Sequence, residues 1–373
     1  MISEKEVLDV REPPGKAVGK LAELWKPVEG TDKIMCTACA RYCKIGEGKV
    51  GLCGIRGVHE GKLWLYVYGR VITGHVDPIE KKPVSHFRPG SKIFSIATTG
   101  CNWLCRYCQN SDISQRRKVE GIEVEPQDVV RMTLEQGCQG LAYTYNQPTI
   151  FIEFARDIGM LARKAGLINI FVSNGYDTPE TVAEMPKFLD CVTVDFKGSG
   201  ETNFVRKYIN IPNADPIFQT ILDTRETKKI HIEITDLIVP QVGDDLGAAR
   251  KLSKWVYDNL GPDTPIHFLR FHPDYKMMEF PWTPVETLEK HCNIAKEEGL
   301  KYVYIGNVSG HRLENTYCPG CGAIAIKRYG FDITGWYLDK DNKCKKCGYK
   351  LAIFGRLEQT AKENRFYSVL YHR

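Results

Sequence analysis

The chain has 373 residues, enough for one large domain or two smaller ones. Its hydrophobic content of 43% and charged content of 26% are ordinary for a soluble globular protein, and the net charge of +5 comes from scattered basic residues, which gives nucleic-acid binding little support. No apolar run approaches the ~20 residues that span a bilayer, and the N-terminus lacks the apolar core of a signal peptide.

The first 90 residues contain the first of three cysteine clusters. The sequence predicts a short helical stretch near Val18–Trp25 and a strand-like passage over Lys62–Thr73. Between them lies a glycine-rich segment with four thiols, Cys36, Cys39, Cys43 and Cys53. We interpret this set as a zinc site, although its spacing is less typical of zinc, and a second iron–sulfur cluster is the alternative.

From about residue 91 to residue 310, short apolar strands alternate with amphipathic helices. The predicted strands are Ile93–Thr98, Gly140–Thr144, Ile168–Ser173, Cys191–Phe196, His231–Val239, Ile266–Phe271 and Tyr302–Ile305. Predicted helices include Thr149–Ala165, Leu246–Leu260 and Pro284–Glu298. Repeated strand–helix units indicate an α/β fold with a parallel sheet, and their number favours a partial or full (β/α) TIM-type barrel over a doubly wound sheet.

The loop after the first of these strands is the most informative segment. It reads C-x3-C-x2-C, with Cys101, Cys105 and Cys108. A [4Fe–4S] cluster normally takes four cysteine ligands, so three thiolates on one loop can hold three corners and leave one iron open to a small molecule. A zinc knuckle that takes its fourth ligand from elsewhere is the alternative.

Beyond residue 310 the sequence contains two C-x2-C-G pairs. They are Cys318 with Cys321 and Cys344 with Cys347. We expect a closed, tetrahedral zinc site of the ribbon type with a structural role; a rubredoxin-type iron site or an auxiliary cluster is the alternative. The predicted organisation is an N-terminal extension over 1–90, a barrel over 91–310 and a zinc-ribbon-like extension over 311–373.

Cysteine usage also indicates the compartment. Of 14 cysteines, all but Cys138, Cys191 and Cys292 belong to the three clusters, and those three lie in apolar contexts typical of small buried side chains. Clustered thiols suit metal sites in a reducing environment better than a secreted disulfide framework. We therefore expect a cytoplasmic protein with no membrane partner.

Polar side chains gather where the predicted strands end. They are Thr144, Asn146, Gln147, Ser173, Asn174, Asp195, Lys197, His272 and Asn307. In (β/α) barrels the active site forms at the carboxyl ends of the strands, so these residues are predicted to share one face with the three-cysteine loop.

Several stretches between residues 36 and 348 resemble one enzyme family. They include Cys36-Thr-Ala-Cys-Ala-Arg-Tyr-Cys, His75-Val-Asp-Pro-Ile-Glu-Lys-Lys-Pro, Cys105-Arg-Tyr-Cys-Gln-Asn, Tyr143-Thr-Tyr-Asn, Ser173-Asn-Gly-Tyr, Val194-Asp-Phe-Lys-Gly and Tyr304-Ile-Gly-Asn-Val. The chain resembles the AmmeMemoRadiSam-system radical S-adenosylmethionine (SAM) enzymes, within the group similar to pyruvate formate-lyase activating enzymes. One departure is Gln147, because the family usually has Glu in this Asn-Glu-Pro motif and that charge is expected to help hold the SAM amino group.

The resemblance implies an oxidoreductase-like enzyme that cleaves SAM reductively at a [4Fe–4S] cluster. The resulting 5′-deoxyadenosyl radical would abstract hydrogen from a protein or small-molecule substrate, with an electron from a low-potential donor such as ferredoxin or flavodoxin. The competing hypothesis is a non-catalytic zinc-binding adaptor on a degenerate barrel.

The resemblance also implies roles for single residues. Tyr107 would lie beside the adenine, and Thr144, Asn146 and Gln147 would face the methionine amino group. Ser173 and Asn174 would reach the ribose or carboxylate, and Asn307 is a further cofactor-binding candidate. Asp195, Lys197 and His272 are the candidate catalytic residues.

Overall fold

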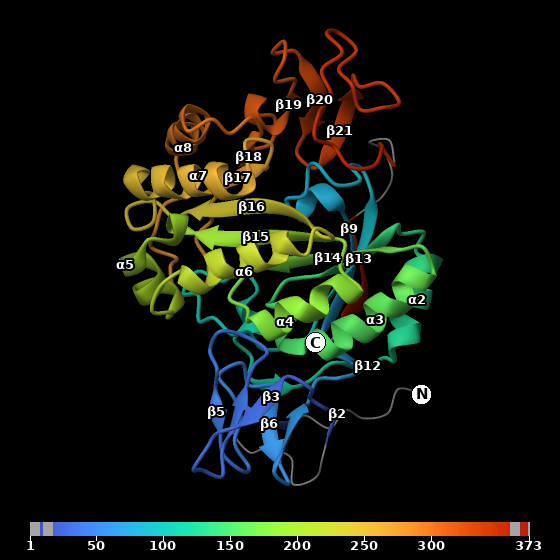
Figure 1. Cartoon of the computed structure of the whole chain (residues 1–373), viewed down its shortest axis with the longest axis vertical. Coiled ribbons are helices and arrows are strands. Elements are labelled where there is room, and N and C mark those ends of the chain that lie inside the picture. The colour runs from blue at the N-terminus through green and yellow to red at the C-terminus, as the bar shows by residue number, and fades with distance from the viewer. Residues whose placement is uncertain (1–7, 10–17, 359–365, 372–373) are drawn as a thin grey trace.

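A computed structural model describes residues 8–9, 18–358 and 366–371. Its centre is a nine-stranded sheet in the order β18-β17-β16-β15-β14-β13-β10-β9-β22 (Figure 1). The strands are β9 (Thr73–Pro78), β10 (Lys92–Ala97), β13 (Gly140–Tyr143), β14 (Ile168–Ser173), β15 (Cys191–Lys197), β16 (His231–Ile238), β17 (Ile266–Arg270), β18 (Val303–Gly306) and β22 (Tyr367–Tyr371).

The strands from β10 to β18 run parallel, whereas β9 and β22 are antiparallel to their neighbours. Each of the seven predicted strands is confirmed, with no end displaced by more than one residue. They are nearly continuous buried apolar runs, as expected where both faces of a parallel sheet are covered. Within the described residues no pairing joins β18 to β22, so the fold is the partial form of the predicted barrel.

Helices cover the outside of the sheet (Figure 1). They are α1 (Ser111–Ser114), α2 (Pro126–Glu135), α3 (Ile152–Lys164), α4 (Pro179–Glu184), α5 (Thr202–Phe204), α6 (Asp215–Glu226), α7 (Leu246–Leu260) and α8 (Val285–Glu297). The three predicted helices are confirmed, the first being split into a 3-10 turn over Pro148–Phe151 followed by α3. No helix among the described residues is long and apolar enough to cross a membrane.

The predicted helical stretch near Val18–Trp25 is wrong. The structure has β2 (Lys20–Leu21) and β3 (Trp25–Pro27) there, paired with β7 (Lys62–Leu65) and β4 (Ile34–Cys36). Gly19 has a φ of +81°, and a side chain at that position would meet the Leu65 carbonyl oxygen at 2.1 Å. Because Lys20 and Leu21 pair with β7, this segment has an extended backbone and does not form a helix.

Small sheets occupy opposite ends of the molecule (Figure 1). At one end lie β4 (Ile34–Cys36), β5 (Lys44–Ile45), β6 (Arg56–His59) and β7 (Lys62–Leu65); at the other lie β19 (Thr316–Tyr317), β20 (Ile324–Tyr329) and β21 (Asp332–Trp336). Two further short pairs join β1 (Leu8–Asp9) to β11 (Lys118–Val119) and β8 (Arg70–Val71) to β12 (Ile122–Glu123). The first and last predicted segments also each supply one strand, β9 and β22, to the central sheet.

Candidate functional site

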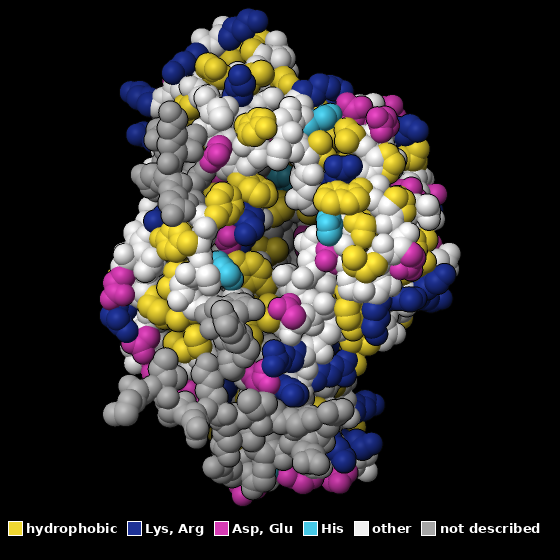
Figure 2. Space-filling view, turned by 180° about the vertical axis from the view of Figure 1, so that it is seen from behind, with side chains coloured by type: hydrophobic (Ala, Val, Ile, Leu, Met, Phe, Trp, Pro, Cys, Tyr) yellow, Lys and Arg dark blue, Asp and Glu magenta, His cyan; other side chains and the backbone are white. Residues whose placement is uncertain are grey.

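A cavity of about 440 Å³ opens at the carboxyl ends of the parallel strands. Its volume falls within the range of about 300–1,000 Å³ that is typical of small-molecule sites. Figure 2 shows the molecule hollowed near the middle of one face. Of the residues predicted for the three-cysteine loop, SAM binding and catalysis, all except Ser173 line the cavity: Cys101, Cys105, Tyr107, Cys108, Thr144, Asn146, Gln147, Asn174, Asp195, Lys197, His272 and Asn307.

The three-cysteine loop is fixed by backbone contacts. Gly100 begins it with a φ of +85°, and a Cβ at this position would lie 2.4 Å from the Cys53 carbonyl oxygen, so only glycine fits. Farther along, the amides of Leu104 and Arg106 donate to the carbonyls of Ile209 and Tyr208 at 3.1 and 2.9 Å. These bonds hold the three sulfurs at the edge of the cavity.

The loop thiols are poorly hydrated. Burial raises the pKa of Cys101 to about 12 and also raises the pKa values of Cys105 and Cys108. Without a metal these groups keep their protons, and a bound cation would favour the thiolates. The arrangement therefore fits a cluster or ion that supplies positive charge.

Asn146 presents an unused acceptor to the cavity. Its Nδ2 donates to the carbonyls of Thr98 and Gly100 at 2.7 and 2.9 Å, which fixes the orientation of the amide. Its Oδ1 is buried and has no hydrogen-bond partner among the described residues. Because an unpaired buried acceptor is costly, this oxygen suits a ligand that carries an N–H donor, such as the ammonium group of an amino acid.

Gln147 uses its whole carboxamide within the protein. Its Nε2 donates to Thr149, Ser173 and Asp177 at 2.8 to 2.9 Å, and its Oε1 accepts from the Asn174 amide at 2.8 Å. Burial raises the pKa of Asp177 to about 6. A Glu at position 147 would set two carboxyl groups against each other, so Gln matches this neighbour. The side chain positions its loop through these bonds.

Ser173 lies behind the cavity wall. Its hydroxyl accepts hydrogen bonds from Gln147 and from the Gly175 amide, at 2.8 and 3.0 Å. It donates a longer one to the Asp177 carboxylate at 3.4 Å. It thus supports the Gln147–Asp177 network. Asn174 lines the cavity itself and donates to the Asn102 side chain at 2.8 Å.

Asp195 and Lys197 point to the same side of β15 and line the cavity. Lys197 Nζ lies 2.9 Å from Asp195 Oδ2, and Thr235 donates to the other carboxylate oxygen. Burial alone would lower the pKa of Lys197, but the neighbouring Asp195 carboxylate raises it above its ordinary value. Lys197 therefore stays cationic beside the cysteine loop.

The other predicted residues form the rest of the wall. The Tyr107 ring stacks on Phe204 with centroids 6.0 Å apart. His272 Nδ1 lies 2.8 Å from Asp274, and Asn307 donates to the Arg270 carbonyl at 3.1 Å.

The sequence interpretation missed a lysine pair in the same cavity. Lys81 and Lys82 line it, and both approach Asp77 at 2.7 Å, while Tyr145 donates to the same carboxylate at 2.5 Å. Burial lowers the pKa of Lys82 to about 8. The stretch 75–83 carries part of the family resemblance, but its lysines reach the cavity only because they follow β9, which pairs with β10 at the side of the parallel strands.

The C-terminal cysteines form a candidate metal centre. Cys318 and Cys347 sulfurs lie 3.5 Å apart, those of Cys321 and Cys344 lie 3.8 Å apart, and all four are within 4.8 Å of one another. Bonds of about 2.3 Å in a tetrahedral site place sulfurs about 3.8 Å apart. This set can therefore hold one metal ion.

Comparison with known proteins agrees with this site. Residues 95–252 match the family model of the radical SAM superfamily, which spans β10, the cysteine loop and the strands through β16. An uncharacterized protein of Methanocaldococcus jannaschii, MJ0808, is 42% identical over 325 residues, which cover 86% of this chain and 96% of that protein.

Solved structures are more distant. A domain of the pyruvate-formate lyase-activating enzyme from Bacteroides vulgatus is 19% identical with a TM-score of 0.39, and covers 45% of this chain and 99% of that one. A radical SAM methyltransferase from Sphaerobacter thermophilus is 11% identical with a TM-score of 0.45, and covers 59% of this chain and 67% of that one.

Proposed function

Because the chain belongs to the radical SAM superfamily, we propose that Cys101, Cys105 and Cys108 hold a [4Fe–4S] cluster at which the enzyme cleaves SAM reductively. The product radical would abstract hydrogen from a protein or small-molecule substrate. The observation that carries the proposal is that the three sulfurs and the unpartnered Asn146 oxygen line one cavity.

The bound cluster and SAM would supply the electron and the radical, while the protein binds, orients and excludes water. Asn146 Oδ1 would accept from the methionine ammonium group, and Lys197 would offer a positive charge to a carboxylate. The buried Tyr107 ring would give the adenine an apolar surface. Thr144, Asn174, Asn307, Asp195 and His272 would complete the polar wall, and Ser173 and Gln147 would position it.

The finer assignments extend this proposal. Motifs such as Val194-Asp-Phe-Lys-Gly support membership of the AmmeMemoRadiSam-system enzymes, with a chemistry similar to activating enzymes. The electron would come from a ferredoxin- or flavodoxin-type donor in the cytoplasm. The catalytic barrel would comprise residues 91–310. It would be preceded by an N-terminal extension over 1–90 and followed by a zinc-ribbon-like extension over 311–373.

Anaerobic incubation with SAM and a low-potential reductant tests the function. Mass spectrometry should detect 5′-deoxyadenosine and methionine in equal amounts. The competing hypothesis, a zinc-binding adaptor, predicts colourless protein and neither product, whereas the enzyme should be brown.

Replacement of Lys197 by Met should weaken SAM or substrate binding. The substitution keeps most of the apolar stem and removes the charge that faces the cavity. We expect at least a tenfold higher Kd, a loss of ~1.4 kcal/mol or more, with the iron content and melting temperature unchanged. Binding is measured by isothermal titration calorimetry.

Lys254→Met is the matched control, since Lys254 is 63% exposed and pairs with the neighbouring Asp258 on α7, away from the cavity. Equal SAM affinity and turnover in Lys197→Met and the control would mean that the Asp195–Lys197 pair serves stability alone.

We also propose that Cys318, Cys321, Cys344 and Cys347 bind zinc with a structural role. Cys321→Ser should lose one zinc and expose the segment after Ile305 to protease, because structural zinc couples binding to local folding. Zinc is measured by mass spectrometry of the metal and cleavage by limited proteolysis. Cys138→Ala, which removes a buried thiol outside all three sets, should leave both unchanged.

The proposal would be refuted if Cys321→Ser matched the parent in both zinc content and cleavage pattern, because this set would then bind no structural metal.

A further inference from the structure

The four N-terminal cysteines surround one enclosed cavity. Cys36, Cys39, Cys43 and Cys53 all line it, together with Arg41 and Arg56. Cys36, Cys39 and Cys53 are buried, and Cys43 is partly buried. The four thiols come from β4 and the two loops that follow it, so a single small module converges its sulfurs on one point.

The spacing of these sulfurs differs from that of the C-terminal set. Among the described residues, Cys318, Cys321, Cys344 and Cys347 form the group whose ligand atoms all lie within 4.8 Å of one another. Neither the N-terminal sulfurs nor those of Cys101, Cys105 and Cys108 form such a group among the described residues. A single tetrahedral zinc would need sulfurs about 3.8 Å apart, whereas a cluster of several irons separates its ligands more widely.

Positive groups face this cavity. Arg56 is 1% exposed and lines it, with Nη1 3.0 Å from Glu153 Oε1. Arg41 also lines it, and its Nη2 is buried with no hydrogen-bond partner among the described residues. An iron–sulfur cluster with four thiolates is anionic and its sulfurs accept hydrogen bonds, so it would satisfy this donor.

The module lies directly behind the three-cysteine loop. Arg41 Nε donates to the Asn102 carbonyl at 2.8 Å, and Asn102 lines the N-terminal cavity while its neighbour Cys101 lines the SAM cavity. The Cys53 carbonyl packs against Gly100 so closely that no side chain fits there. Two consecutive residues, Cys101 and Asn102, thus line the two different cavities.

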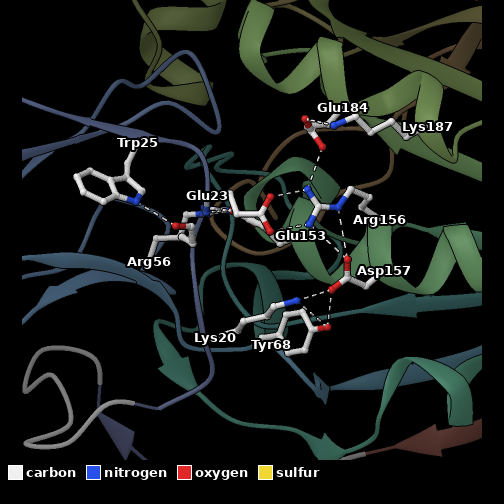
Figure 3. Close-up of polar contacts among 11 residues, drawn as sticks. Lys20, Glu23, Trp25, Arg56, Tyr68, Glu153, Arg156, Asp157, Glu184 and Lys187 are labelled. Carbon is white, nitrogen blue, oxygen red and sulfur yellow. Dashed lines mark hydrogen bonds and ion pairs between the residues drawn. The ribbon is translucent and has the colours of Figure 1, made fainter.

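The module is held in this place by helix α3. Figure 3 shows Arg156 of that helix between Glu23 and Glu184, and Asp157 between Lys20 and Tyr68. The segment between Cys36 and Cys39 is fixed by Thr178 and Thr181, whose hydroxyls donate to the carbonyls of Thr37 and Ala38 at 2.6 and 2.8 Å.

We infer that Cys36, Cys39, Cys43 and Cys53 bind a second iron–sulfur cluster beside the first. Its binding does not depend on the proposed function. Its role does: at this position it is suited to carry the single electron that SAM cleavage consumes, taken from a ferredoxin- or flavodoxin-type carrier.

The test counts metals in full-length protein purified anaerobically. The Cys101→Ala/Cys105→Ala/Cys108→Ala variant lacks the loop ligands and should still hold about four irons and four acid-labile sulfides, besides zinc at the C-terminal set. Adding Cys36→Ser and Cys39→Ser should reduce iron to below a tenth of that value. Adding Cys138→Ala instead should leave it unchanged.

Electron paramagnetic resonance of the dithionite-reduced parent gives a second readout that needs no N-terminal substitution. Two adjacent reduced clusters should broaden each other's signals, and the loop variant should show one unbroadened signal. A loop variant with zinc but no iron would overturn the inference, and so would iron that survives loss of Cys36 and Cys39. Either result leaves SAM cleavage by the parent, and hence the proposed function, untouched.

Discussion

Cys105→Ala should abolish reductive SAM cleavage while the fold survives. Cys105 is the central thiol of the loop and lines the cavity, so its loss leaves two thiolates for a cluster that needs three. Replacing a residue that only supports a metal ligand already lowers metal affinity or activity about 10–100-fold. We therefore expect loss of a ligand itself to lower the rate more than about a hundredfold. The rate of 5′-deoxyadenosine formation measures the effect.

Cys292→Ala is the control, because it makes the same Cys-to-Ala change away from the cavity. Cys292 lies on α8, buried against the Tyr304 carbonyl of β18. It should keep the parent's SAM cleavage rate. A Cys105→Ala protein that cleaves SAM at the parent's rate would refute the cluster assignment. Circular dichroism would confirm that the barrel remains folded.

Arg56→Met should destabilise the protein more than any other substitution considered above. Arg56 and Glu153 are each 1% exposed and form a two-pronged ion pair between the N-terminal module and α3. The variant leaves the Glu153 carboxylate buried without its cationic partner, with the Glu23 amide and its own backbone amide as donors. Breaking a buried pair in this way costs about 3–5 kcal/mol. The midpoint of urea unfolding reports the loss.

The effect should depend on pH. Burial would raise the pKa of Glu153, but Arg56 lowers it below its ordinary value, so the pair stabilises the folded state at neutral pH and this contribution falls as Glu153 is protonated. In Arg56→Met burial raises the pKa of Glu153 instead, so the difference between the variant and the parent should shrink as the pH is lowered toward and below about pH 4.

Arg131→Met is the matched control, because Arg131 is 60% exposed and its pairs with Asp128 and Glu135 lie on the surface of α2. Exposed pairs contribute about 0–1 kcal/mol. A loss in Arg56→Met no larger than in this control would show that the buried pair does not hold the module to the barrel.

Local pattern was sufficient for most of the barrel. The strand over Ile168–Ser173 and the helix over Leu246–Leu260 were predicted to the residue, because buried parallel strands read as apolar runs and α7 begins at an Asp245 cap. The stretch near Val18–Trp25 failed for the opposite reason. Its conformation is set by pairing with β7, which lies more than 40 residues away in the sequence.

The same division holds for the site. Spacing alone grouped the cysteines, and the strand-end rule brought Asn146, Lys197 and His272 to one cavity. It could not show that Ser173 lies behind the wall or that Lys82 lies in it, since both depend on how the sheet curves and which neighbours fill its inner face.

The sequence by itself therefore determined the repeated strand–helix units and the three cysteine sets through periodicity and short spacing, whereas the superfamily followed from the resemblance of its motifs. Only the tertiary structure decided that Gln147 is matched to the buried Asp177, that Asn146 Oδ1 has no hydrogen-bond partner among the described residues, and that the four C-terminal sulfurs lie within 4.8 Å of one another. These properties arise between side chains of different elements, and their burial and distances are fixed by packing, which no single segment of the chain encodes.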